Sequence, residues 1–297
     1  MTVAPRPAVP VLRRGDCQLW WASAQDDPWL RTLLDDRERA RAERLRHPAA
    51  RSLYVGAHAL ARTVVAAHLG IPVRELELVA VCKQCGGAHG KPQPPAPLRL
   101  SLSHSGARVV VALAHSTDIG VDVEEIAPHT PEATERALAP PERASLAALP
   151  APERSAGFIR YWTRKEALLK ATGDGLTVPP ALLHVTAPDA APRLLSWSGP
   201  ERPRLPLRLY DLDAGTGHRA ALASVGAPVR LTHHDGAALL DAARGPAPRT
   251  TTCLPTRTPA PVPAHAEAPP AHAGASPAHA GASVSPYTTT SEGQFTS

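Results

Sequence analysis

The sequence has little of several features, and each shortage excludes a class of protein. No apolar run is long enough to cross a bilayer. The opening stretch MTVAPRPAVPVLRRG has prolines where a secretory signal needs a continuous apolar segment. With 43% hydrophobic and 20% charged residues, the composition is typical of a soluble globular protein. We therefore expect a cytoplasmic protein with no membrane segment, whose four cysteines are reduced.

Lysine is also scarce. Of the 32 lysines plus arginines, only Lys83, Lys91, Lys165 and Lys170 are lysines, which leaves 28 arginines (32 − 4). Arginine keeps its proton in proteins, whereas the pKa of a lysine can be lowered until it acts as an acid or base. Two of the four lysines flank Glu166, so that segment is a candidate for chemistry.

Charge is nearly absent from the C-terminal end. From residue 245 onward only four residues are charged, prolines are frequent, and PAHAGAS occurs twice in succession. Such a segment buries too little apolar surface to fold, so residues 245–297 are expected to be a disordered tail. Its regularly spaced histidines, His265, His272 and His279, are assigned no function.

Hydrophobic periodicity predicts helices followed by strands, twice along the chain. In the first round, helices reach residue 46 and cover 49–69, and strands lie at 17–22, 76–81, 98–102, 109–114 and 119–123. In the second round, helices fall within 131–171 and strands lie at 182–185, 205–209, 220–225 and 229–231. This order predicts an α+β protein with two similar α/β halves, residues 15–117 and 118–235, after a flexible N-terminus at residues 1–14.

The segment DIGVDVEE holds two carboxylates that converge. A strand with period two puts Asp122 and Glu124 on one face, while Val121, Val123 and Glu125 point the other way. A buried carboxylate pair is costly without a cation, and its hard oxygen ligands suit Mg²⁺ or Mn²⁺. The alternative is an exposed acidic strand facing water, which this segment alone leaves open.

A helix later in the chain adds a third carboxylate. In WTRKEALLK, helical spacing stacks Trp162, Glu166 and Lys170 on one face. The alternative is an ordinary i,i+4 ion pair on an exposed helix, and the scarcity of lysine argues against it. On their own, Asp122, Glu124 and Glu166 indicate a site for a cation and a phosphate-linked group.

The segment RLSLSHSGARVVVALA offers polar donors on a predicted strand. Ser101, Ser103 and Ser105 alternate with Leu102 and His104 before a turn at a glycine. A hydrolase triad is not persuasive here, because no acid lies near the histidine in the sequence. Phosphate binding by these side chains stays open.

The segment CKQCGGAHGKP has two interpretations. Cys82 and Cys85 have CxxC spacing with His89 nearby, but no second pair follows to complete a zinc site. The glycines around Lys91 instead predict a flexible loop that lets the backbone and one lysine approach a phosphorylated ligand.

Taken together, GKP at 90–92, SLSHSG at 101–106, GVDVE at 120–124 and WTRKEALLKATGDGL at 162–176 resemble the 4′-phosphopantetheinyl transferases of the surfactin-synthetase-activating class. The resemblance extends over roughly residues 15–235, outside the tail. It implies an enzyme of two pseudo-twofold α/β halves with the active site between them. Such an enzyme moves the phosphopantetheine arm of coenzyme A to a serine of an apo acyl or peptidyl carrier protein, with Mg²⁺, and releases 3′,5′-ADP.

The resemblance also implies roles for individual residues. Asp122, Glu124 and Glu166 would hold the metal. Glu166 would also take the proton of the attacking serine, while Lys170 would stabilise or protonate the departing phosphate. The residues expected to bind coenzyme A are Ser103 and His104 at a phosphate, Lys91 and Pro92 beside the nucleotide, and Arg51 and Arg41 at the 3′-phosphate.

A carrier protein is the expected partner, because the recognition helix of such proteins is usually acidic. The segment between Glu125 and Trp162 would face it, with Arg136, Arg143 and Arg154 supplying complementary charge. We expect a monomer, with no nucleic acid and no membrane as partner. The expected carrier is one of polyketide, peptide or fatty-acid synthesis, and surface complementarity with this segment selects among them.

Two other functions stay open from the sequence. A Mg²⁺-dependent phosphodiesterase could use the same three carboxylates with water as its nucleophile. A nucleic-acid-binding module could use the basic stretch at residues 35–51, although aromatic residues are only 4% of the chain and no known readout motif occurs.

Overall fold

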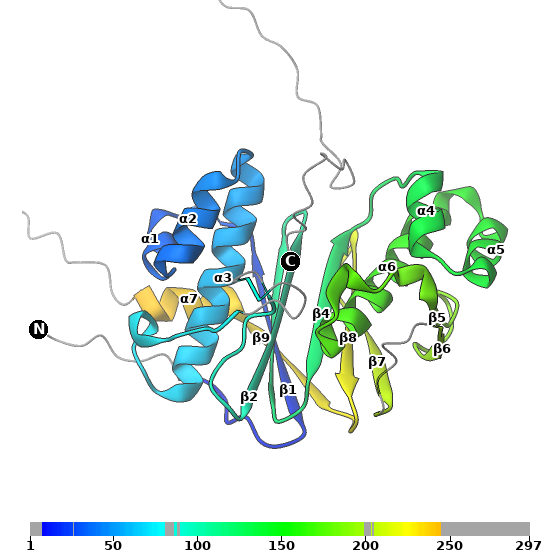
Figure 1. Cartoon of the computed structure of the whole chain (residues 1–297). Helices are drawn as coiled ribbons and strands as arrows, with labels where there is room; N and C mark the ends of the chain where they lie inside the picture. Colours follow the sequence, from blue (N-terminus) through cyan, green and yellow to red (C-terminus); the bar gives the residue numbers. More distant parts are fainter. Residues whose placement is uncertain are drawn as a thin grey trace, which may run out of the picture. The chain divides into compact units, whose positions relative to one another are not determined.

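The computed structural model describes residues 8–25, 27–80, 86–87, 90–198, 203 and 205–244. The tail from residue 245 and the CxxC pair Cys82 and Cys85 lie outside these residues. The described chain is a mixed α+β protein, in which two sheets are flanked by helices (Figure 1). No helix in this part of the chain combines the length and the apolar character that a membrane span needs.

The first sheet has the strand order β2-β3-β1-β9. The strands are β1 (Asp16–Ser23), β2 (Leu98–Ser105), β3 (Arg108–His115) and β9 (Arg230–Asp235). The β2–β3 hairpin turns at Gly106, whose φ of 57° favours glycine. β1 pairs antiparallel with β3 and parallel with β9, so a strand from the segment predicted as the C-terminal half completes the first sheet.

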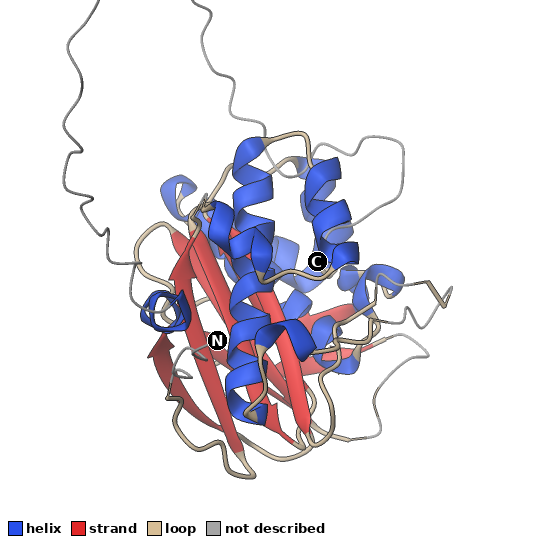
Figure 2. Ribbon diagram, turned by 90° about the vertical axis from the view of Figure 1, so that its left-hand side faces the viewer, coloured by secondary structure: helices blue, strands red, loops and turns tan. Residues whose placement is uncertain are grey.

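Four helices accompany this sheet, namely α1 (Pro28–Thr32), α2 (Asp36–Arg44), α3 (Pro48–Leu69) and α7 (Gly236–Arg244). α3 begins with a proline in its first turn and ends at Gly70 in the left-handed conformation. Its apolar residues, including Leu60 and Val64, join the leucines of β2 in one core. Figure 2, which shows the molecule from the left-hand side of Figure 1, has helices lying in front of the first sheet.

The second sheet has the order β4-β8-β7, all antiparallel, from β4 (Ile119–Glu125), β7 (Leu207–Leu212) and β8 (His218–Val225). A core that includes Leu19, Val110 and Leu222 lies between the two sheets. The long helix α6 (Ala151–Thr172) packs against β4 and β8. It approaches closely at Gly120, where an added Cβ would lie 2.2 Å from the carbonyl oxygen of Ala167.

The remaining elements lie beside α6, apart from η1. They are α4 (Pro131–Ala137), α5 (Pro140–Ala148), the hairpin of β5 (Leu183–Val185) and β6 (Leu194–Trp197), and the 3-10 turns η1 (Val73–Glu75), η2 (Gly175–Thr177) and η3 (Pro180–Leu182). Of these, only η1 belongs with the first sheet, at the end of α3. The sequence did not predict β6 or α7.

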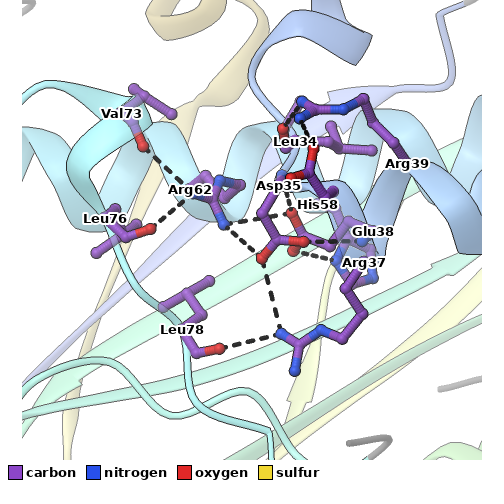
Figure 3. A network of polar contacts seen from close by, with 12 residues as sticks. Leu34, Asp35, Arg37, Glu38, Arg39, His58, Arg62, Val73, Leu76 and Leu78 are labelled. Carbon is purple, nitrogen blue, oxygen red and sulfur yellow. Dashed lines mark hydrogen bonds and ion pairs between the residues drawn. The ribbon is translucent and has the colours of Figure 1, made fainter.

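The strand predicted at residues 76–81 is wrong for the part that is described, where only Val79 forms an isolated bridge, to Gln93. Side chains take the backbone acceptors that a ladder would use (Figure 3). The buried guanidinium of Arg62 donates to the carbonyl oxygen of Leu76 at 2.7 Å, and Arg37 donates to that of Leu78 at 3.1 Å. This segment is therefore held to α2 and α3 by arginines.

Candidate active site

The two predicted carboxylates of β4 lie beside β2 and α6. The valines of β4 are fully buried between the sheets, so alternation turns Asp122 and Glu124 to the other face of the strand. Asp122 is 2% exposed. Its Oδ1 accepts hydrogen bonds from Ser103 Oγ at 2.9 Å and Lys170 Nζ at 2.8 Å. Its Oδ2 is buried and has no hydrogen-bond partner within the described residues.

The third carboxylate is buried because α6 lies across the second sheet. Glu166 is 8% exposed, and its Oε1 also lacks a partner in the described part of the chain. Trp162, on the preceding turn, is half-buried. Lys170 forms its ion pair with Asp122 across the interface between helix and strand. The alternative of an i,i+4 ion pair on an exposed helix is therefore wrong, as is the alternative of an acidic strand facing water.

Burial and like charge determine the electrostatics of this cluster. Burial, with the charge of Asp122 as the next cause, raises the pKa of Glu124 to about 8 and that of Glu166 to about 7. Burial opposes the charge of Lys170, but the surrounding carboxylates outweigh it and raise the pKa of that ammonium above its ordinary value. The lysine is therefore cationic at neutral pH and supplies one positive charge beside three carboxyl groups.

The chemistry of these groups fits a hard divalent cation. When all three carboxyl groups are ionised, as a nearby cation favours, they and the ammonium carry a net charge of −2 (−3 + 1). Two of their oxygens, Asp122 Oδ2 and Glu166 Oε1, have no partner among the described residues. As the side chains stand, no three His, Cys, Asp or Glu residues of the described chain surround one ion position. Asp122, Glu124 and Glu166 are the residues that would hold the ion.

Lys91 extends from its loop to the ends of two elements of the site. Its Nζ donates to the carbonyl oxygen of Ile119, the first residue of β4, at 2.6 Å and to that of Lys170 at 3.0 Å. The lysine thus joins the start of the carboxylate strand to the end of the helix that carries Glu166. Pro92, which follows it, is half-buried. The expected contact of both residues with a nucleotide stays a prediction.

The predicted phosphate ligands divide between the two faces of β2. Ser103 faces β4, whereas His104, by alternation, lies on the side of α3. Burial lowers the pKa of His104 to about 4, with the nearby charges of His58, Lys170 and Arg41 acting in the same direction. Binding of a coenzyme A phosphate by Ser103 and His104 stays a prediction.

Arg51 has a local contact instead. Its guanidinium donates to the carbonyl oxygen of Leu45 at 2.8 Å and 3.3 Å, and Leu45 is the residue at which α2 ends. The arginine thus fixes the connection between α2 and α3. Arg41 lies over the ring of Tyr54, with 5.8 Å from its Cζ to the ring centroid. Binding of a 3′-phosphate by either arginine stays a prediction.

One residue beside the site has a contact that the sequence analysis missed. In the sequence, Lys165 is notable only as one of four lysines and as the neighbour of Glu166. In the structure it is fully buried and forms an ion pair with the equally buried Glu142 of α5. The two residues are 23 positions apart, so no local sequence pattern pairs them. The scarcity of lysine marks Lys165 as unusual but does not indicate its partner.

Comparisons with known proteins are consistent with this geometry. A family model described as the 4′-phosphopantetheinyl transferase superfamily matches residues 118–223, which include the three carboxylates and Lys170. The 4′-phosphopantetheinyl transferase HetI of Nostoc sp. is 30% identical over 186 residues, covering 59% of this chain and 76% of HetI. A putative 4′-phosphopantetheinyl transferase of Synechocystis sp., slr0495, is 30% identical over 166 residues, covering 53% of this chain and 65% of that protein. Bacillus subtilis Sfp is 33% identical over 93 residues, covering 31% of this chain and 41% of Sfp.

Proposed function

Since the chain belongs to the 4′-phosphopantetheinyl transferase superfamily, we propose that it transfers the phosphopantetheine arm of coenzyme A to a serine hydroxyl of an apo carrier protein. The observation that carries the proposal is the cluster of Asp122, Glu124, Glu166 and Lys170, in which Asp122 and Glu166 are buried and each has one carboxylate oxygen without a partner within the described residues. Such a cluster suits a cation and a diphosphate, whose charges neutralise one another.

In the proposed reaction the serine oxygen of the carrier forms a bond to the phosphorus next to the pantetheine. The bond from that phosphorus to the oxygen of the 3′,5′-ADP leaving group breaks. Glu166 accepts the serine proton, directly or through water. Lys170, cationic at neutral pH, offsets the charge that develops on the departing phosphate. A metal ion, when bound, supplies Lewis acidity to the diphosphate oxygens.

Coenzyme A would span both halves of the protein. His104 and Arg41 would hold phosphate groups on the side of α3, and Ser103 would bind a phosphate on the side of β4. A histidine whose pKa is near 4 is neutral before the ligand binds, so it contributes a hydrogen bond, and its protonation is favoured once a phosphate dianion is adjacent. Mg²⁺, or Mn²⁺ in its place, is the proposed cation.

An acidic carrier protein would dock on the region of α4 and α5. Arg136 and Arg154 are exposed there, and Arg143 is half-buried. Two hydrogen bonds to backbone carbonyls, both at 3.0 Å, hold the guanidinium of Arg154, so its charge is presented in a fixed place. Carriers of polyketide or nonribosomal peptide synthesis are the proposed class. A monomeric enzyme in the cytoplasm, with no nucleic acid as partner, completes the proposal.

The test is incubation of the protein with coenzyme A, Mg²⁺ and an apo carrier protein, followed by mass spectrometry of the carrier. We expect a gain equal to one phosphopantetheine arm per carrier, and none when Mg²⁺ is chelated. An unchanged carrier mass would refute the transferase function. Cleavage of coenzyme A without loading of the carrier would favour a phosphodiesterase.

Glu166→Gln tests the assignment within this reaction. The substitution removes the proton acceptor and one metal ligand, so we expect the rate of transfer to fall by about 10²-fold or more. Binding of coenzyme A, measured by calorimetry, should be largely kept because the residues on the α3 side are unchanged. Near-normal turnover of this variant would contradict the role of Glu166.

A further inference from the structure

The strands β2 and β4 are neighbours although they belong to different sheets. Serine hydroxyls connect them. Ser101 Oγ accepts a hydrogen bond from the backbone N–H of Val121 at 3.0 Å, and Ser105 Oγ accepts one from that of Glu125 at 3.1 Å. Each serine contacts a residue twenty positions later in the chain, so the two strands are parallel.

Alternation along β2 explains why side chains make this connection. The leucines of β2 pack into the core with α3, so the serines between them project from the opposite face, toward β4. A face of one sheet therefore meets the edge of the other, and hydroxyls supply the acceptors that the N–H groups of this edge require. Ser101 is 4% exposed and Val121 fully buried, so water cannot readily replace that acceptor.

The middle serine of the three has a different partner. Ser103 Oγ donates to Asp122 Oδ1 at 2.9 Å and receives a hydrogen bond from Lys170 Nζ at 3.2 Å. The outer two serines thus hold the backbone on either side of the carboxylates, at Val121 just before Asp122 and at Glu125 just after Glu124. Only the middle serine reaches into the charged cluster.

We propose that Ser101 and Ser105 are positioning residues that hold the carboxylate face of β4 in register with the phosphate-binding end of β2. Ser105 acts at the backbone beside a proposed ligand, because its hydroxyl accepts from the N–H of Glu125, the residue that follows Glu124. The proposal rests on the proposed function, in which the metal ligands of β4 and the phosphate ligands of β2 hold the same substrate. Partners that orient ligands in this way commonly affect metal affinity as well as rate.

The test compares Ser105→Ala with Ser105→Thr, which keeps the hydroxyl, and with Ser224→Ala as a matched control. Ser224 lies in β8, is fully buried, and donates one hydrogen bond, to the carbonyl oxygen of Ala227 at 3.1 Å. Its replacement by alanine removes one serine hydroxyl and one hydrogen bond to the backbone, as Ser105→Ala does, and leaves the serine contacts between β2 and β4 in place. Mn²⁺ affinity is measured by electron paramagnetic resonance on protein without coenzyme A. Amide hydrogen exchange at Glu125 is followed by NMR on metal-free protein.

We expect Ser105→Ala to lose Mn²⁺ affinity by about tenfold or more and to exchange the Glu125 amide faster, whereas Ser105→Thr and Ser224→Ala stay close to wild type on both measures. Ser105→Ala with wild-type Mn²⁺ affinity would overturn the positioning role, even if its stability fell. Equal losses in Ser105→Ala and Ser224→Ala would overturn it as well, by assigning the effect to stability. If wild-type protein bound Mn²⁺ but loaded no carrier, the proposed function alone would fail.

Discussion

Replacing Lys165 with methionine should destabilise the protein far more than its single charge suggests. The ammonium donates to the carbonyl oxygens of Ala137 at 2.7 Å and Pro180 at 3.1 Å, and it pairs with Glu142. The carboxylate of Glu142 also accepts from the N–H of Val185 at 2.8 Å. The pair therefore ties α6 to the α4–α5 connection, to η3 and to β5.

The expected cost follows from burial. The side chains of both Lys165 and Glu142 are 0% exposed, so removing the lysine leaves an uncompensated buried carboxylate, which costs about 3–5 kcal/mol. That is a large fraction of the ~5–15 kcal/mol by which domains are usually stable. The double variant Lys165→Met with Glu142→Gln removes the stranded charge and keeps one acceptor oxygen for the two backbone N–H groups, of Ala139 and Val185, that Glu142 binds. We expect the free energy of unfolding of the double variant to be about 2 kcal/mol higher than the sum of the losses in the two single variants would give.

Urea unfolding followed by circular dichroism measures all four proteins of this cycle. The midpoint should fall sharply for Lys165→Met and rise again for the double variant, with similar slopes. A loss below about 1 kcal/mol for Lys165→Met would show that the pair is solvated or rearranged, since exposed ion pairs contribute that little. The burial argument would then be refuted.

Three further predictions concern single residues. Gly120→Ala should cost about 3 kcal/mol or more in urea unfolding, because the new Cβ would lie 2.2 Å and 2.3 Å from backbone atoms of Ala167 and Ala171; an unchanged midpoint would contradict that packing. Cys17 is fully buried, and burial raises its thiol pKa to about 12. Iodoacetamide at pH 8 should therefore modify it only in unfolded protein, and a modified Cys17 peptide in the mass map of native protein would contradict this. Burial lowers the pKa of His104 from 6.5 to about 4, so the unfolded chain binds this proton first and the free energy of unfolding should fall as the pH drops from 6.5 toward 4. His104→Gln should weaken that dependence, and identical pH profiles for the two proteins would argue against it.

The parts of the fold with strong local signals are predictable from sequence. α3 is one example, because a proline begins it, a glycine ends it and its apolar residues repeat with helical spacing. The alternation in β4 likewise places Asp122 and Glu124 opposite the valines, as the structure confirms. These features depend on neighbours within a few residues.

The features that sequence did not yield depend on contacts between distant residues. Lys170 meets Asp122 across 48 positions, and Arg62 meets Leu76 in a segment that looks like a strand. The serines of β2 were recognised as donors, but their contacts with β4 required the position of one sheet against the other. Burial decided each case, because it determines which polar atoms must find a protein partner.

The pairing of β9 with β1 has a consequence for how the chain matures on the ribosome. Among the described strands, β1 is synthesised first and pairs on one side with β9, which is synthesised last, since Asp16 lies opposite Arg230. Until β9 has left the exit tunnel, one edge of β1 has unpaired backbone groups, and such an edge is a site where chains associate wrongly. Completion of the first sheet is therefore a late event in synthesis, and a factor that shields this edge during translation would raise the yield of folded enzyme.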